Sequence, residues 1–135
     1  MKLVNNRRVV LATLIGFLWV ASTSIVFADV NDYEFRLVQQ EVKKGDGVTI
    51  TVRLVDKKTG KAIPDAVIFA RRIDMAPDGM AMMEAPLEIL PSTEPGVYLF
   101  RTNLTMAGGW QLSLGAKIQG EEGTVENRLV LKVLP

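Results

Sequence analysis

From residue 32 onward, apolar and polar side chains alternate with a period of two, and turn-forming residues interrupt this alternation at short intervals. The clearest stretch runs from Trp110 to Ile118, where every second residue is apolar. Because successive side chains of a strand point to opposite sides of a sheet, this pattern is typical of strands with one buried face. About seven such stretches occur, at residues 33–37, 48–54, 67–73, 87–90, 96–102, 110–118 and 125–134. We therefore predict an all-β domain, an immunoglobulin-like antiparallel β-sandwich of about seven strands.

The inward positions of these strands predict the residues of the hydrophobic core. They are Phe35, Val52, Leu54, Phe69, Tyr98, Phe100, Trp110, Leu112, Leu114 and Leu131.

The N-terminus has the three parts of a secretory signal peptide. Three basic residues precede an apolar run from Val9 to Ala21, and Val26 and Ala28 occupy the −3 and −1 positions of a cleavage site. We predict a signal peptide at residues 1–28 and one exported, periplasmic domain at residues 29–135. The alternative is a retained membrane anchor, but the apolar run is short, since a membrane-spanning helix needs about 20 apolar residues.

The composition of residues 29–135 excludes several kinds of function. Three of the 16 Lys and Arg residues belong to the signal peptide, so 13 remain against 15 acidic residues, a net charge of −2. A chain without a basic stretch has no electrostatic footprint for nucleic acid. The sequence contains no cysteine, so the fold must be held by packing without disulfides.

Ordinary enzyme chemistry also lacks its residues. The chain has no histidine, the commonest general base, so neither Ser92 nor Ser113 has a partner that would activate it. The Gly108–Gly109 pair does not lie between a strand and a helix, as a phosphate-binding loop requires. We predict that the protein is not an enzyme.

Methionine is concentrated in one part of the chain. All five methionines of the predicted domain lie between positions 75 and 106, namely Met75, Met80, Met82, Met83 and Met106. The turn sequence Pro77-Asp78-Gly79 favours a loop or sheet end for the first four. Thioether sulfur is a soft ligand that suits Cu(I) or Ag(I) better than Zn or Mg.

Two other interpretations of the methionines stay open. Methionine also fills irregular gaps in cores, and methionine-rich surfaces serve as adaptable protein-binding sites. The nearby carboxylates Asp74, Asp78 and Glu84 could bind a hard cation, although solvated turn charges explain them more simply. Trp110 is expected in the core, with a ring placed over a methionine-bound cation as the alternative.

Three segments resemble the YtkA-like/FixH-like family of exported bacterial domains. They are Gly60–Val67, Gly96–Tyr98 and Met106–Trp110, within a resemblance that extends over residues 33–133. The resemblance implies an immunoglobulin-like sandwich in the periplasm that handles copper or other heavy metals. It also implies a partner in metal efflux or in cytochrome oxidase assembly.

Together, the methionines and the resemblance predict a non-enzymatic protein that binds Cu(I), or Ag(I), and exchanges it with an envelope metal-transport or oxidase-assembly partner. The expected ligands are Met75, Met80, Met82 and Met106, with Met83 as a substitute for Met82. The alternative is a metal-free interaction module of an envelope transport or assembly complex. No nucleic acid partner is expected, and membrane attachment only if the N-terminal segment is retained as an anchor.

Export is expected to produce a mature protein that begins at Asp29, because Val26 and Ala28 precede that position in the cleavage pattern. N-terminal sequencing of protein recovered from the periplasm measures this directly. A membrane-bound product that still carries Lys2 would support the anchor instead.

Overall fold

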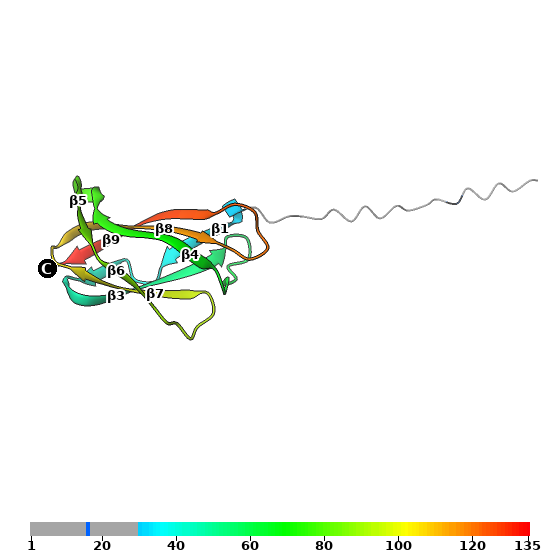
Figure 1. Cartoon of the computed structure of the whole chain (residues 1–135), viewed down its shortest axis with the longest axis horizontal. Helices are drawn as coiled ribbons and strands as arrows, with labels where there is room; N and C mark the ends of the chain where they lie inside the picture. The colour runs from blue at the N-terminus through cyan, green and yellow to red at the C-terminus, as the bar shows by residue number, and fades with distance from the viewer. Residues whose placement is uncertain (1–15, 17–29) are drawn as a thin grey trace, which may run out of the picture.

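The computed structural model describes Gly16 and residues 30–135 (Figure 1). Apart from Gly16, the predicted signal peptide and its cleavage site lie outside the described residues. No helix in the described part of the chain is long and apolar enough to cross a membrane.

Residues 30–135 form strands in two layers, with two single 3-10 turns, η1 (Val30–Asp32) and η2 (Ala76–Asp78) (Figure 1). The strands are β1 (Tyr33–Leu37), β2 (Glu41–Lys43), β3 (Gly45–Asp56), β4 (Val67–Met75), β5 (Met80–Ala85), β6 (Leu87–Leu90), β7 (Val97–Leu104), β8 (Gly108–Lys117) and β9 (Val125–Leu134). One sheet has the order β1-β3-β7-β6 and the other the order β2-β9-β8-β4-β5. The predicted immunoglobulin-like β-sandwich is confirmed, with two short strands, β2 and β5, beyond the seven expected.

The pairing is antiparallel throughout both sheets except at one edge. There β2 runs parallel to β9, with Val42 opposite Val133. The long strands β8 and β9 pair in register from Gly108 opposite Val133 to Ala116 opposite Val125, and they form the centre of the five-stranded sheet. Their alternation therefore directs one continuous apolar face toward the other sheet.

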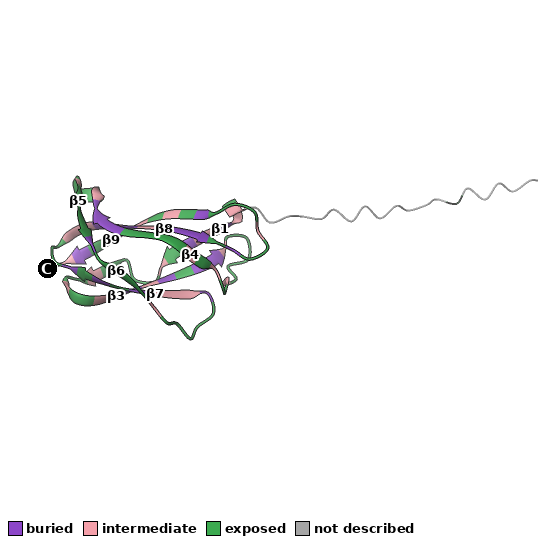
Figure 2. Cartoon of the chain, viewed as in Figure 1, coloured by how far each residue is buried: buried purple, intermediate pink, exposed green. Residues whose placement is uncertain are grey.

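The core lies between the two sheets, where the predicted alternation places it. Trp110, Leu112 and Leu114 of β8 are buried, and they pack with Phe35 and Phe100 of the four-stranded sheet. Buried residues alternate with exposed ones in the second half of β7 and with half-buried ones from Trp110 to Leu114 of β8, and Figure 2 colours these classes. A core of this kind stabilises the fold through the apolar area that it removes from water.

One predicted core residue is placed wrongly by the period-two pattern. Phe69 is 55% exposed, because a β-bulge between Ile68 and Ala70 adds one residue to β4 and turns its side chain outward. The Phe69 ring lies over Gly115 of β8, where an added Cβ would come within 3.1 Å of the ring. The glycine is therefore needed for close contact with the aromatic ring.

Tyr98 ties the segment before β4 to the four-stranded sheet. Its hydroxyl donates a hydrogen bond to the Ile63 carbonyl (3.1 Å) and accepts one from the Ala66 N–H (3.0 Å). Burial raises the pKa of Tyr98, with a contribution from the charge of Asp65 and against the effect of the Ala66 N–H. The hydroxyl thus keeps the proton that it donates.

The same segment explains a glycine at the start of β7. Gly96 has a φ of 76°, and an added Cβ there would lie 2.6 Å from the Cβ of Ala62. Two of the three segments that carry the family resemblance therefore contact each other, namely Gly60–Val67 and Gly96–Tyr98. Their contact is part of the packing of the fold.

Replacing Leu112 by alanine is expected to lower the free energy of unfolding by about 2–5 kcal/mol, because the side chain is fully buried and leaves a cavity. Urea denaturation measures the change. Val130→Ala is the matched control, since Val130 is 57% exposed and its truncation should stay within about 0.5 kcal/mol. Equal effects of the two substitutions would contradict the assigned core.

Tyr98→Phe is expected to destabilise the domain by about 1–3 kcal/mol, because it leaves the Ile63 carbonyl and the Ala66 N–H without their partner. Tyr33→Phe is the comparison, since the Tyr33 hydroxyl bonds the half-exposed Glu121 carboxylate, which water can solvate instead. The two free energies of unfolding are measured under the same conditions. A Tyr98 variant as stable as the Tyr33 variant would show that the two Tyr98 hydrogen bonds contribute little to stability.

Candidate methionine site

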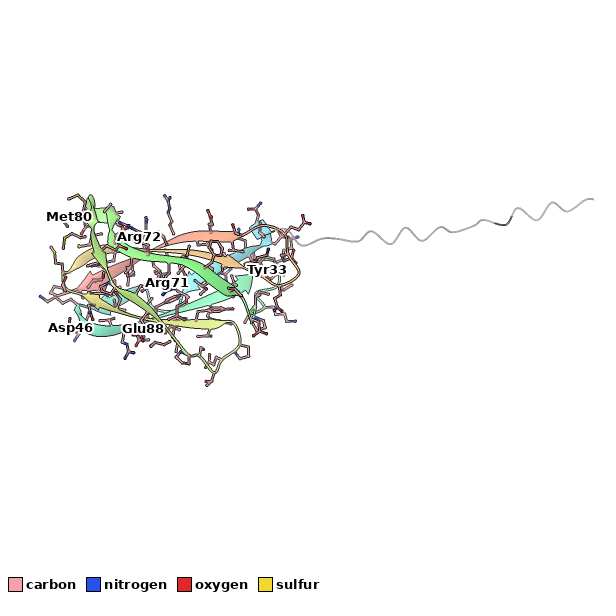
Figure 3. All side chains as sticks on the ribbon, viewed as in Figure 1. Tyr33, Asp46, Arg71, Arg72, Met80 and Glu88 are labelled. Carbon is pink, nitrogen blue, oxygen red and sulfur yellow. The ribbon has the colours of Figure 1, made fainter. Side chains whose placement is uncertain are left out.

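The five methionines differ in depth at one end of the sandwich. Met75, the last residue of β4, is fully buried in the core, and Met80, the first residue of β5, is half-buried against it. Met82 is 93% exposed, whereas Met83 and Met106 are each 40% exposed. Figure 3 shows sulfur atoms at the end of the sandwich that carries the labelled Met80.

Three separate segments meet at this end. Met75 and Met80 are opposite each other in the β4–β5 ladder. The methyl carbon of Met75 faces the start of β8, where it would lie 3.1 Å from a Cβ added to Gly108. Gly108 follows Met106 by two residues, so the loop between β7 and β8 brings Met106 to the same end of the sandwich as Met80.

The edge strand β5 carries a wide bulge. Asp74 is opposite Glu84, and the next residue of β4, Met75, is opposite Met80. One step along β4 therefore faces four steps along β5, and residues 81–83 form the excess, which we call the methionine bulge. Met82 and Met83 belong to this bulge.

Arg72 closes the base of the methionine bulge. Its Nη2 donates to the Ala81 carbonyl at 2.8 Å, and its Nη1 lies 3.1 Å from Oε2 of Glu84. Its Nε donates to Oδ2 of Asp74 at 2.6 Å. One guanidinium thus joins both sides of the bulge to strand β4.

We call these three contacts of Arg72 the clamp, and Asp74 links the clamp to the η2 turn. The side chain is buried, and its second carboxylate oxygen accepts a hydrogen bond from the Ala76 N–H at 2.9 Å. Burial acts to raise the pKa of Asp74, but the Arg72 and Ala76 hydrogen bonds, with the charges of Arg72 and Arg128, hold it below its ordinary value. Asp74 is therefore charged at neutral pH, as its ion pair with Arg72 requires.

Asp78 connects the same turn to the loop that carries Met106. Its Oδ2 accepts a hydrogen bond from the Gly109 N–H at 3.0 Å, and a Cβ at Gly108 would collide with that oxygen. Trp110 then completes the connection, since its indole Nε1 donates to the Met106 carbonyl at 3.0 Å. Hydrogen bonds therefore run from the methionine bulge through η2 to the loop.

The carboxylates near the methionines are engaged by the protein itself. Asp74 and Glu84 pair with Arg72, and Asp78 bonds the backbone of β8. Among the described residues, no group of three or more His, Cys, Asp or Glu side chains is placed to hold a metal ion. Trp110 is buried in the core, as its position in the alternation predicts.

The chemistry available at this end therefore comes from thioethers. The whole chain has no His and no Cys, so methionine sulfur is its only soft side-chain ligand. The sequence alone points to all five methionines, but not to Arg72 or to the role of Asp78. An opposite charge two positions beyond Arg72, on the same face of a strand, was the available clue to the clamp.

Several solved structures are distantly similar to this chain, and two of them illustrate the similarity. A structure described as the Lin-41 filamin domain is 15% identical, covering 76% of this chain and 92% of that one, with a TM-score of 0.46. A structure described as the ZirS C-terminal domain is 12% identical, covering 85% and 74% respectively, with a TM-score of 0.43. No curated protein matches the sequence.

The sequence does match one protein family. The YtkA-like family aligns with residues 27–115, which include strands β1 to β7, the methionine bulge, the η2 turn, Met106 and most of β8. This alignment covers well over half of the 135 residues. The chain therefore belongs to the YtkA-like family.

Proposed function

We propose that this protein is an exported, non-enzymatic domain that binds Cu(I), or Ag(I), through methionine sulfur and exchanges it with a partner of a metal efflux or oxidase-assembly system. The observation that carries the proposal is the exposure of methionine side chains at one end of the sandwich. Large apolar side chains are usually buried, and a cluster left in contact with solvent needs a reason.

The accessible donors are Met80, Met83 and Met106, with Met82 at the outermost position. Met75 is packed beneath them in the core and would become a ligand only by turning its sulfur toward Met80. Two or three thioethers with free access to solvent form an open site, from which a partner can take the metal. Such a site suits exchange better than storage.

The chemistry of thioethers sets the selectivity of the site. Thioether sulfur carries no proton near neutral pH, so Cu(I) affinity should depend little on pH, unlike that of His or Cys sites. Zn(II) prefers nitrogen, thiolate and carboxylate ligands and should bind poorly.

A second candidate function is a metal-free interaction module of an envelope transport or assembly complex. The exposure of Met82, on an edge strand, is the observation that favours it. Flexible methionine side chains adapt to different partner surfaces.

The double substitution Met80→Leu with Met106→Leu separates the two functions. Leucine preserves volume and apolarity, so each substitution should lower the free energy of unfolding by less than about 1.5 kcal/mol. The variant is expected to lose Cu(I), measured by competition with a chromophoric Cu(I) chelator under reducing conditions. Ile89→Leu is the matched control, because Ile89 is as exposed as Met106 but lies on β6 of the other sheet.

Wild-type Cu(I) affinity in the folded double variant would overturn the metal site. The methionines would then be packing or docking residues, and the interaction module would become the better account.

A further inference from the structure

We propose that Arg72 is a positioning residue that fixes the methionine bulge, and so sets where Met82 and Met83 stand relative to Met80. The inference deepens the proposed function, on which its metal-binding part rests. Arg72 does not itself supply a ligand, since a guanidinium is cationic and has no free electron pair for a metal.

The methionine bulge depends on ties outside the strand ladder. Residues 81–83 are the excess of four steps on β5 over one step on β4, so the regular β4–β5 pairing does not set their conformation. β5 is also the edge of its sheet, with β4 as its neighbour. Flexible methionine side chains on such a segment would otherwise sample many positions.

Arg72 provides the tie at both sides of the bulge. Ala81, whose carbonyl accepts from Nη2, directly precedes Met82, and Glu84, which pairs with Nη1, directly follows Met83. The Nε bond to the buried Asp74 sets the plane of the guanidinium against β4. A planar fork of donors can make these three contacts together, whereas a lysine ammonium is a single point of charge.

The clamp lies on the outer side of the fold. The Arg72 side chain is 46% exposed, whereas that of Asp74 is 6% exposed, so loss of the cation would leave a buried carboxylate with fewer partners and lower the stability. Asp74 keeps the Ala76 N–H as a second partner if Arg72 is changed. Arg72→Lys, which keeps the charge beside Asp74, should therefore give a folded domain with a freer bulge, whereas Arg72→Gln should also be less stable.

The experiment compares Arg72→Lys and Arg72→Gln with Arg71→Lys in the mature domain. Arg72→Lys keeps a positive charge beside Asp74 and guards against a variant that fails to fold. Arg71 is the matched control, because it is the neighbouring arginine on β4 and its Nε bonds the Leu87 carbonyl, away from the bulge.

The first measurement requires no metal. Dilute hydrogen peroxide oxidises each thioether by one oxygen atom, and mass spectrometry gives a separate rate for each methionine. Met83 and Met106 are equally exposed, so Met106 is the internal reference. In both Arg72 variants Met83 should oxidise several-fold faster relative to Met106, and in Arg71→Lys the ratio should stay at the wild-type value. An unchanged ratio in folded Arg72→Lys would overturn the proposal.

The second measurement is Ag(I) affinity by competition. Loss of a residue that orients metal ligands commonly lowers affinity about 10–100-fold, and we expect a decrease in this range for both Arg72 variants but not for Arg71→Lys. Wild-type affinity in the Arg72 variants would overturn the positioning of ligands. If the unmodified domain binds neither Ag(I) nor Cu(I), the proposed function is overturned, and the oxidation ratio alone decides whether Arg72 fixes the bulge.

Discussion

The contact between the inner faces of the two sheets is the interaction on which the rest of this domain depends. The chain has no cysteine, so no disulfide shares the work of holding the layers together. The buried faces of β8 and β9 pack against β3 and β7, and Leu112 and Phe100 are fully buried in that contact. Close packing of this kind leaves the strand ends and edges free to vary, because they contribute less to the core.

At one end of the sandwich the regular strand pairing stops, and hydrogen bonds from polar side chains hold the segments instead. Strand β4 ends in the buried Met75, and the chain then turns through η2 into a bulged edge strand. Arg72, Asp74 and Asp78 join the bulge, the turn and the start of β8 by hydrogen bonds. Arg72 and Asp78 are exposed and Asp74 is buried, and the hydrogen bonds of all three shape this end of the fold.

The extent to which sequence predicts this structure follows from how local each feature is. The alternation from Trp110 to Ile118 predicts a half-buried strand, because side-chain direction is set by the backbone of the strand itself. Phe69 does not follow the period-two alternation because one extra residue in β4 shifts it. The indication of this in the sequence is Gly115, which is forty-six positions away and lies beneath the Phe69 ring.

At the methionine end of the sandwich, fewer features can be predicted from the local sequence. The turn at Pro77–Gly79 was predictable from its residues, as was the position of the loop that carries Met106 at the same end of the sandwich. Strand β5 was not, because its bulge has no regular period. The clamp by Arg72 depends on a register in which Asp74 faces Glu84, and period-two reasoning does not supply that register.

The start of the first strand and the methionine cluster lie at opposite ends of the sandwich. Tyr33, where the first strand begins, and Met80 are labelled at opposite ends of the domain in Figure 3, and the C-terminus in Figure 1 lies at the methionine end. Whatever precedes residue 30 in the chain therefore attaches at the far end from the sulfur atoms. Any tether on that side, to a bilayer or to a neighbouring domain, would join the domain at the end opposite the thioethers and leave the methionine end clear of the attachment.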